Sequence, residues 1–281
     1  MNTFDEQHPL PEGVSSEVPP TPGPAQPEDL QISWSWPHFI VFVLFGVISL
    51  AMVQAILAVR YLPSHQKLTS RQMEQILLSK PQFAIGSMLI WYGLIFFFLY
   101  VTLSLLRGHP FWTILGWRKI RPSPSGKTRN LRTFFFQGSA LSLLVAVMTA
   151  RLTPPEHAPM EELFKYRQTA LLFIAMAVLV APLVEETLFR GYLYPLFARS
   201  FGTAPGIVLT GVLFGLMHGA QLGWTWSLVS VLMIVGIVFT LVRARTGSVV
   251  ASYFMHLGYN SLIAVAALLS THGFTKLPLA R

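Results

Sequence analysis

The sequence predicts an all-α membrane protein, a polytopic transmembrane bundle with seven to eight spans. Hydrophobic residues make up 53% of the 281-residue chain and charged residues only 11%, whereas soluble domains average about 25% charged residues. Apolar runs of about 20 residues, the length that crosses the hydrocarbon core, follow one another along the chain. A soluble fold of this size would need more polar surface than these residues can supply.

The chain divides into a polar tail and a membrane domain. Residues 1–33 are predicted to be a disordered, Pro-rich acidic tail, since residues 1–30 hold six acidic residues and no Lys or Arg. Residues 34–275 are predicted to be the transmembrane helical domain, and the polar residues and motifs considered below lie in its part at about 168–270. The candidate spans are 37–59, 82–106, 133–150, 168–198, 204–222, 225–243 and 248–270.

Span length and loop charge add detail to this prediction. The run 168–198 is long enough to bend, with Pro182 and Gly191 as candidate bend points. The segment 107–132 has seven Lys and Arg residues and no acid, which is typical of a cytoplasmic loop. The protein is therefore expected to be an integral, multi-pass membrane protein whose N-terminus is cytoplasmic.

The net charge of +8 raises the question of a nucleic-acid partner. The basic residues lie mostly in short segments between apolar runs, which suits contact with anionic lipid headgroups better. The expected partners are therefore the lipid bilayer and no nucleic acid. The chain has no cysteine, which excludes disulfides, thiolate metal sites and a cysteine nucleophile.

Ionisable and amide side chains gather in the later spans. A charge inside a span costs at least about 2.5 kcal/mol on insertion scales, so one that persists usually has a partner or a function. Every other Asp or Glu of the chain lies in the tail or in a loop. The polar residues of the later spans are Glu185, Glu186, Arg190, His218, His256 and Asn260.

The two adjacent glutamates are expected to differ in role, because neighbouring side chains on a helix point about 100° apart. Glu186 and Arg190 are at i, i+4 with the acid first, the favourable order for an ion pair. Glu185 has no such partner and is a candidate to accept a proton from water. A salt-bridged cluster that only locks helices together is the structural alternative.

The two histidines also have structural alternatives. His218 follows Gly211 and Gly215 on a helix expected to pack closely through small residues, and a lone buried histidine is more often a core residue than a ligand. His256 and Asn260 are at i, i+4, so they face the same way and could orient water or only join two helices. Together, the three clusters have the composition of a hydrolytic site in a water-filled cavity.

Three motifs carry a resemblance to a known family. Residues 185–190 read EExxxR, residues 214–218 read FxxxH and residues 256–260 read HxxxN. In this order, over about 180–262, they resemble the motifs of the CAAX prenyl endopeptidase type II family and its CPBP or Abi relatives. The resemblance implies a CAAX-protease-like helical fold and an intramembrane endopeptidase acting on a membrane-associated or prenylated peptide or protein.

The resemblance also implies roles for single residues. Glu185 would activate water, with Glu186 and Arg190 as supports, and Asn260 would stabilise the oxyanion together with imidazole from His218 or His256. Family members are usually labelled metalloproteases, and the sequence leaves open whether Zn²⁺ is bound. If it is, Glu185, His218 and His256 would be the ligands, since His₂Glu is an accepted catalytic zinc set.

Two other functions are compatible with the same residues. The first is a non-catalytic member of the same fold, acting as a bacteriocin-immunity or scaffold protein. The second is a proton-coupled transporter, which the one-sided distribution of polar residues disfavours, because transporters commonly have repeats in both halves. Convergence of Glu185, both imidazoles and Asn260 in one place would support the protease prediction, and so would a membrane-embedded cavity open toward the cytoplasm.

Overall fold

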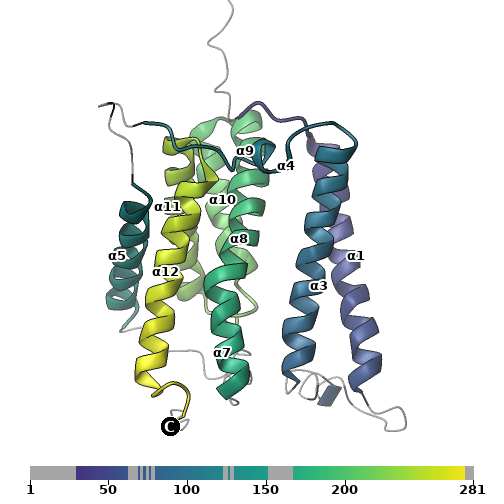
Figure 1. Cartoon of the computed structure of the whole chain (residues 1–281), viewed down its shortest axis with the longest axis vertical. Coiled ribbons are helices and arrows are strands. Elements are labelled where there is room, and N and C mark those ends of the chain that lie inside the picture. The colour runs from purple at the N-terminus through teal and green to yellow at the C-terminus, as the bar shows by residue number, and fades with distance from the viewer. Residues whose placement is uncertain are drawn as a thin grey trace, which may run out of the picture.

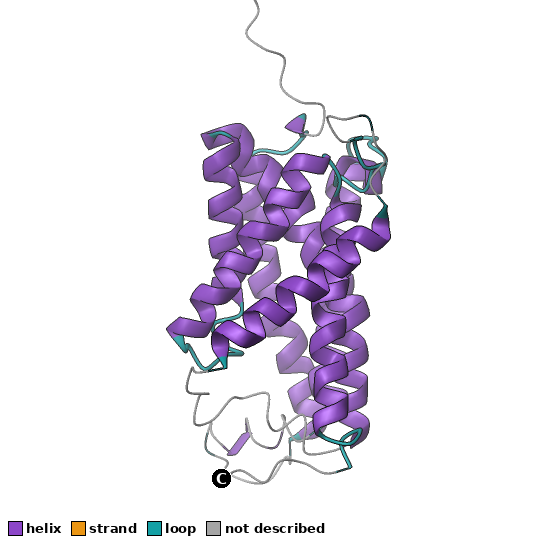
Figure 2. Cartoon of the chain, turned by 90° about the vertical axis from the view of Figure 1, so that its left-hand side faces the viewer, coloured by secondary structure: helices purple, strands orange, loops and turns teal. Residues whose placement is uncertain are grey.

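The protein is an upright helical bundle, and the described residues contain no strand (Figures 1 and 2). The computed structural model describes residues 30–62, 69, 72–73, 76, 80–122, 126, 130–150 and 167–275. The α-helices are α1 Trp36–Tyr61, α3 Pro81–Leu99, α4 Phe111–Ile114, α5 Leu131–Thr149, α7 Arg167–Ala175, α8 Ala181–Glu186, α9 Tyr194–Phe201, α10 Thr203–Met217, α11 Trp226–Thr246 and α12 Val249–Ser270. Three π-helical segments are η2 Tyr100–Leu105, η3 Met176–Val180 and η4 Thr187–Leu193.

Six helical stretches among the described residues are long and apolar enough to cross a membrane, which confirms the polytopic helical bundle. They are Trp36–Tyr61, Phe83–Leu105, Leu131–Thr149, Arg167–Phe201, Trp226–Thr246 and Val249–Ser270. Most of the outward-facing surface of α1 and α5 is exposed aliphatic or aromatic side chain, as expected of helices that meet lipid tails.

The predicted span 204–222 differs from the structure, where its helix α10 has 15 residues and stops at Met217. Such a helix is about 22 Å long, shorter than the hydrocarbon core of about 30 Å. The chain turns back because the Trp224 amide donates to the Gly219 carbonyl, and the Trp224 ring covers Gly219 so closely that a Cβ there would lie 2.4 Å from it. His218 therefore sits at the end of a helix inside the bundle.

The predicted close approach of helices through small residues is present between α10 and α11. A Cβ on Gly211 would lie 2.4 Å from the Ile237 backbone, and one on Gly215 would lie 2.6 Å from the Met233 backbone. Gly236 of α11 faces Gly211 in return, because its Cβ would meet the Gly211 carbonyl at 2.7 Å. This contact holds α10 against α11 although α10 is short.

Helix α5 packs against α12 even more closely. A Cβ on Gly138 would lie 1.8 Å from the Met255 carbonyl oxygen, and one on Gly258 would lie 1.9 Å from the Phe135 carbonyl oxygen. The Ser139 hydroxyl donates to the Gly258 carbonyl at 3.1 Å. The backbone of α12 around His256 is thus fixed from the side that faces away from α7 and α8.

The long fourth span, Arg167–Phe201, is interrupted twice. Pro182 and Gly191, predicted as bend points, lie just after η3 and inside η4. A π-turn adds one residue to the turn and rotates every following side chain about the helix axis, and such turns are frequent at functional sites. Both interruptions flank Glu185 and Glu186, so they set the directions in which these two carboxylates point.

The helices α1 and α3 form a hairpin joined to the rest of the bundle near one end (Figure 1). Trp34 is buried and stacks on Tyr192 with ring centroids 5.2 Å apart. The Tyr192 hydroxyl and His38 Nδ1 are 2.7 Å apart, and His38 Nε2 lies 2.9 Å from the Thr102 hydroxyl. The predicted disordered tail lies outside the described residues up to position 29, and Leu30 is buried beside Tyr194.

Candidate functional site

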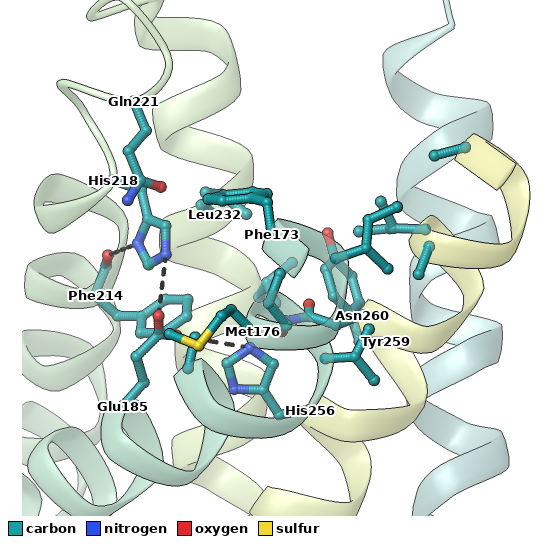
Figure 3. Close-up of a pocket in the computed structure, with 18 of the residues that line it drawn as sticks. Phe173, Met176, Glu185, Phe214, His218, Gln221, Leu232, His256, Tyr259 and Asn260 are labelled. Carbon is teal, nitrogen blue, oxygen red and sulfur yellow. Dashed lines mark hydrogen bonds and ion pairs between the residues drawn. The ribbon is translucent and has the colours of Figure 1, made fainter. Parts of the chain in front are cut away.

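Glu185, His218 and His256 meet in the middle of the bundle (Figure 3). Glu185 Oε1 lies 3.9 Å from His218 Nε2, and Glu185 Oε2 lies 3.7 Å from His256 Nε2. The Glu185 and His218 side chains are each 19% exposed, whereas His256 is 4% exposed. One carboxylate thus stands between two imidazoles that come from helices 33 and 71 residues further along the chain.

The hydrogen bonds of the two imidazoles decide which ring nitrogen faces Glu185. His218 Nδ1 lies 2.7 Å from the Phe214 carbonyl, which only accepts, so Nδ1 carries the hydrogen. His256 Nδ1 lies 3.0 Å from Glu186 Oε1, and a carboxylate likewise accepts. In the neutral ring, Nε2 of each histidine is then the acceptor, and both Nε2 atoms face the carboxylate of Glu185.

Glu186 and Arg190 form the predicted ion pair, with Arg190 Nη1 2.9 Å from Glu186 Oε1 and both side chains fully buried. Arg190 also donates to the Gly236 carbonyl at 2.8 Å and to the Thr240 hydroxyl at 3.2 Å. Its guanidinium lies 4.5 Å from the centre of the Phe214 ring, a distance typical of a cation–π contact. The pair holds Glu186 in place, and Glu186 in turn holds His256.

Aromatic rings fix the two imidazoles from their other sides. Phe214 lies one turn before His218, with ring centroids 4.7 Å apart, and Phe239 of α11 packs on His256 at 4.8 Å. Phe214 and Phe239 themselves are fully buried. Both histidines are therefore held at Nδ1 and along a ring face, which leaves Nε2 as the group directed at Glu185.

Asn260 lies one turn beyond His256 and lines the same cavity. Its Nδ2 donates to the backbone carbonyl of Ala177 at 2.7 Å. Figure 3 shows Asn260 beside Met176 and Tyr259, set apart from the contact between Glu185 and His218. The structure therefore brings four of the six predicted site residues to one cavity and places Glu186 and Arg190 behind it.

The cavity has a volume of about 390 Å³. Its wall is mostly apolar and includes Phe173, Met176 and Leu232. Its lining residues on α7 and η3 precede Glu185, and those on α12 follow His256. The cavity therefore extends from the site toward the start of α7 and the end of α12, at the opposite end of the bundle from the segment after η2 (Figure 1).

This direction bears on two expectations taken from the sequence. The sequence predicts a cytoplasmic location for segment 107–132, and a cavity open toward the cytoplasm would support the protease prediction. The cavity extends away from the end of the bundle where the described part of that segment lies. The two are therefore incompatible, because the segment and the direction of the cavity lie toward opposite ends of the bundle.

The sequence interpretation did not identify most residues of the cavity wall, and three of them are informative. Met88 and Tyr92 of α3 form part of the cavity wall, and Gln221 lies in the turn after His218. The α3 residues belong to a span without charged groups, so no ionisable side chain marked them in the sequence. Gln221 follows His218 by three residues, but its position on the cavity depends on the early end of α10.

Glu185, His218 and His256 are residue types that bind zinc, but their donor atoms lie farther apart than the ligands of a bound zinc ion would. Two donors on a tetrahedral zinc ion, each about 2.1 Å from it, stand about 3.4 Å apart. The oxygen–nitrogen separations at Glu185 are 3.7 and 3.9 Å. Within the described part of the chain, no group of three His, Cys, Asp or Glu side chains is arranged to hold a metal ion.

Comparison with known proteins agrees with the motif resemblance. Residues 167–262 match a family model described as Type II CAAX prenyl endopeptidase Rce1-like. The match runs from the first residue of α7 into α12 and contains all six predicted site residues. The chain matches no curated protein and no solved structure.

Proposed function

Because residues 167–262 form a domain of the type II CAAX prenyl endopeptidase Rce1-like family, we propose that this protein is an intramembrane endopeptidase in which Glu185 activates water. The observation that carries the proposal is the carboxylate of Glu185 between two imidazole Nε2 atoms, at 3.7 and 3.9 Å. Polar atoms separated by more than about 3.5 Å commonly share a bridging water.

Such a water would be oriented by its acceptors. It donates one hydrogen to the Glu185 carboxylate and the other to an imidazole Nε2, so an oxygen lone pair remains for attack on a peptide carbonyl. Glu185 takes the proton as the oxygen–carbon bond forms. The carbon–nitrogen bond then breaks, and Glu185 returns the proton to the leaving amine.

The buried pair behind the site would support this step. Glu186 accepts the Nδ1 hydrogen of His256, so the Nε2 atom of His256 remains an acceptor. A buried carboxylate orients the catalytic histidine of serine proteases in the same way. Arg190 neutralises Glu186 in an apolar surrounding. The family's role for its asparagine is stabilisation of the oxyanion; for Asn260 this role competes with the bond that its Nδ2 donates to the Ala177 carbonyl.

If the protein uses a metal ion, zinc is the one expected from a donor set of two histidines and a glutamate. Glu185, His218 and His256 would be its ligands, and bound zinc would act as a Lewis acid and lower the pKa of its water. The donor spacing at Glu185 is 0.3 to 0.5 Å wider than tetrahedral zinc needs, from separations of 3.7 and 3.9 Å against about 3.4 Å. We therefore favour a reaction in which the carboxylate alone activates water.

The substrate would be a membrane-associated or prenylated peptide or protein. The apolar wall formed by Phe173, Met176 and Leu232 suits an apolar chain next to the scissile bond. For orientation, we keep segment 107–132 on the cytoplasmic side because of its seven basic residues without an acid. The N-terminus is then cytoplasmic, and the cavity extends from the site toward the opposite face.

The test is cleavage of a peptide library by purified protein in lipid nanodiscs. Glu185→Gln and His218→Ala should each lower the rate by at least about 100-fold, the usual contribution of a positioned acid–base group. His109→Ala, outside the cavity, is the matched control and should cleave like the wild type. Equal cleavage by Glu185→Gln and the wild type would refute the assignment. An absence of cleavage by the wild type would leave only a non-catalytic member of the fold.

A further inference from the structure

The backbone just before Glu185 contains a carbonyl that the helix itself cannot pair. In η3, the Met176 carbonyl accepts from the Ala181 amide, a bond that spans five residues. The next carbonyl, Ala177, has two conceivable helical donors. The α-helical donor is the Ala181 amide, which is already bonded to Met176, and the π-helical donor is residue 182, a proline without an amide hydrogen.

Asn260 supplies the missing donor from another helix. Its Nδ2 lies 2.7 Å from the Ala177 carbonyl oxygen, a short and therefore well-formed hydrogen bond. Backbone groups at membrane depth are almost always paired, since lipid tails offer no alternative partner. Proline-interrupted membrane helices in particular depend on neighbouring side chains to pair the freed carbonyl.

The position of this bond connects it to Glu185. The π-turn η3 rotates the helix that follows it, so its geometry sets where Glu185 points from α8. Asn260 lies one turn after His256 on α12, the helix that carries one of the two imidazoles. The hydrogen bond between Asn260 and Ala177 thus connects η3, which determines the direction of Glu185, to α12, which carries His256.

We propose that Asn260 is a positioning residue that holds η3 in its π-turn and thereby aims Glu185 at the two imidazoles. The inference rests on the proposed function of Glu185 as the base. It gives the amide of Asn260 a role other than donation to the reacting oxygen, because the contact that the structure contains is the Nδ2 bond to the Ala177 carbonyl. Pro182 is the reason that an amide is required at position 260.

The proline makes the proposal testable by rescue. Pro182→Ala restores a backbone amide at position 182, which can then pair with the Ala177 carbonyl in the π-register. If Asn260 acts only through that carbonyl, Pro182→Ala makes Asn260 dispensable. If Asn260 instead donates to the oxyanion, a backbone amide at position 182 cannot replace it.

The experiment compares kcat and KM for four proteins in nanodiscs: wild type, Pro182→Ala, Asn260→Leu and the double variant. Asn260→Leu is close to isosteric and lacks a donor, and its kcat should fall by about 100-fold with little change in KM. Pro182→Ala alone should stay within about threefold of the wild type, because Asn260 still pairs Ala177. The double variant should regain at least about tenfold in kcat over Asn260→Leu.

A gain of less than tenfold in the double variant would overturn the proposal. Asn260→Ala offers a second, smaller replacement for the same comparison if Asn260→Leu does not fold. Thermal unfolding of the four proteins supplies a readout independent of catalysis: Asn260→Leu should lower the midpoint more in the wild-type background than in the Pro182→Ala background, where the new amide pairs Ala177. Failure of the Glu185 test leaves this difference intact, so the two proposals can fail separately.

Discussion

Arg190 is the fully buried cation behind the site, and its removal has a calculable effect on stability. Its guanidinium donates to the Glu186 carboxylate at 2.9 Å, to the Gly236 carbonyl at 2.8 Å and to the Thr240 hydroxyl at 3.2 Å. On the scale of about 0.6 kcal/mol found for hydrogen bonds between membrane helices, the two bonds to α11 and the one to Glu186 together contribute about 2 kcal/mol. Loss of one partner of a buried ion pair typically costs about 3–5 kcal/mol, because the other charge is left uncompensated.

Arg190→Met is therefore expected to lower the free energy of unfolding by about 2–5 kcal/mol. Adding Glu186→Gln removes the uncompensated charge and keeps an oxygen that can accept the Nδ1 hydrogen of His256. The double variant should regain at least about 1 kcal/mol over Arg190→Met. Arg245→Met removes an exposed arginine of α11 as the matched control and should change stability by less than about 0.5 kcal/mol.

The assay is reversible unfolding by SDS in mixed micelles, followed by the fluorescence of the seven tryptophans. A loss of less than about 1 kcal/mol in Arg190→Met would refute the reasoning, since the lower bound comes from three bonds each of average strength. Additive losses in the double variant would also refute it. They would show that Glu186 does not depend on Arg190 for compensation of its charge.

Three further predictions concern packing, metal and orientation. Gly258→Ala places a Cβ 1.9 Å from a backbone carbonyl of α5 and should lower the free energy of unfolding by about 1–3 kcal/mol in the same assay. Gly86→Ala is the control and should be tolerated, because a Cβ there has nothing within 4 Å. Cleavage should persist after zinc chelation, and a loss of cleavage that added zinc restores would contradict this. Since the chain has no cysteine, Lys119→Cys and Gln221→Cys can be labelled with an impermeant maleimide in sealed vesicles. Lys119→Cys should react from the cytoplasmic face and Gln221→Cys from the opposite face, and the reverse pattern would invert the proposed topology.

Much of the fold could be predicted from local properties of the chain. Apolar composition requires membrane helices, because the backbone must be paired within each span. The Glu186–Arg190 ion pair and the Phe214–His218 contact were predictable because residues four apart on a helix are always neighbours. The close packing through Gly211 and Gly215 follows from the same periodicity.

Other features depend on where a helix stops. The apolar run 204–222 reads as a full span, yet α10 ends at Met217 and leaves His218 at a helix end. The apolar character falls after Met217, at His218, Gly219 and Gln221, but isolated polar residues also occur inside membrane spans, so composition did not identify the turn that Trp224 and Gly219 make. The result is that Gln221 reaches the cavity, which a continuous helix through that position would not have indicated.

What the sequence by itself determined is the class of fold, the set of polar residues and the neighbours within one helix turn. Only the tertiary structure decided that Glu185 stands between His218 and His256, that α3 supplies part of the wall, and that Asn260 bonds to Ala177. The physical reason is helix rotation. One extra residue in a π-turn redirects every side chain after it by roughly 100°, and only contacts with other helices settle whether that turn forms.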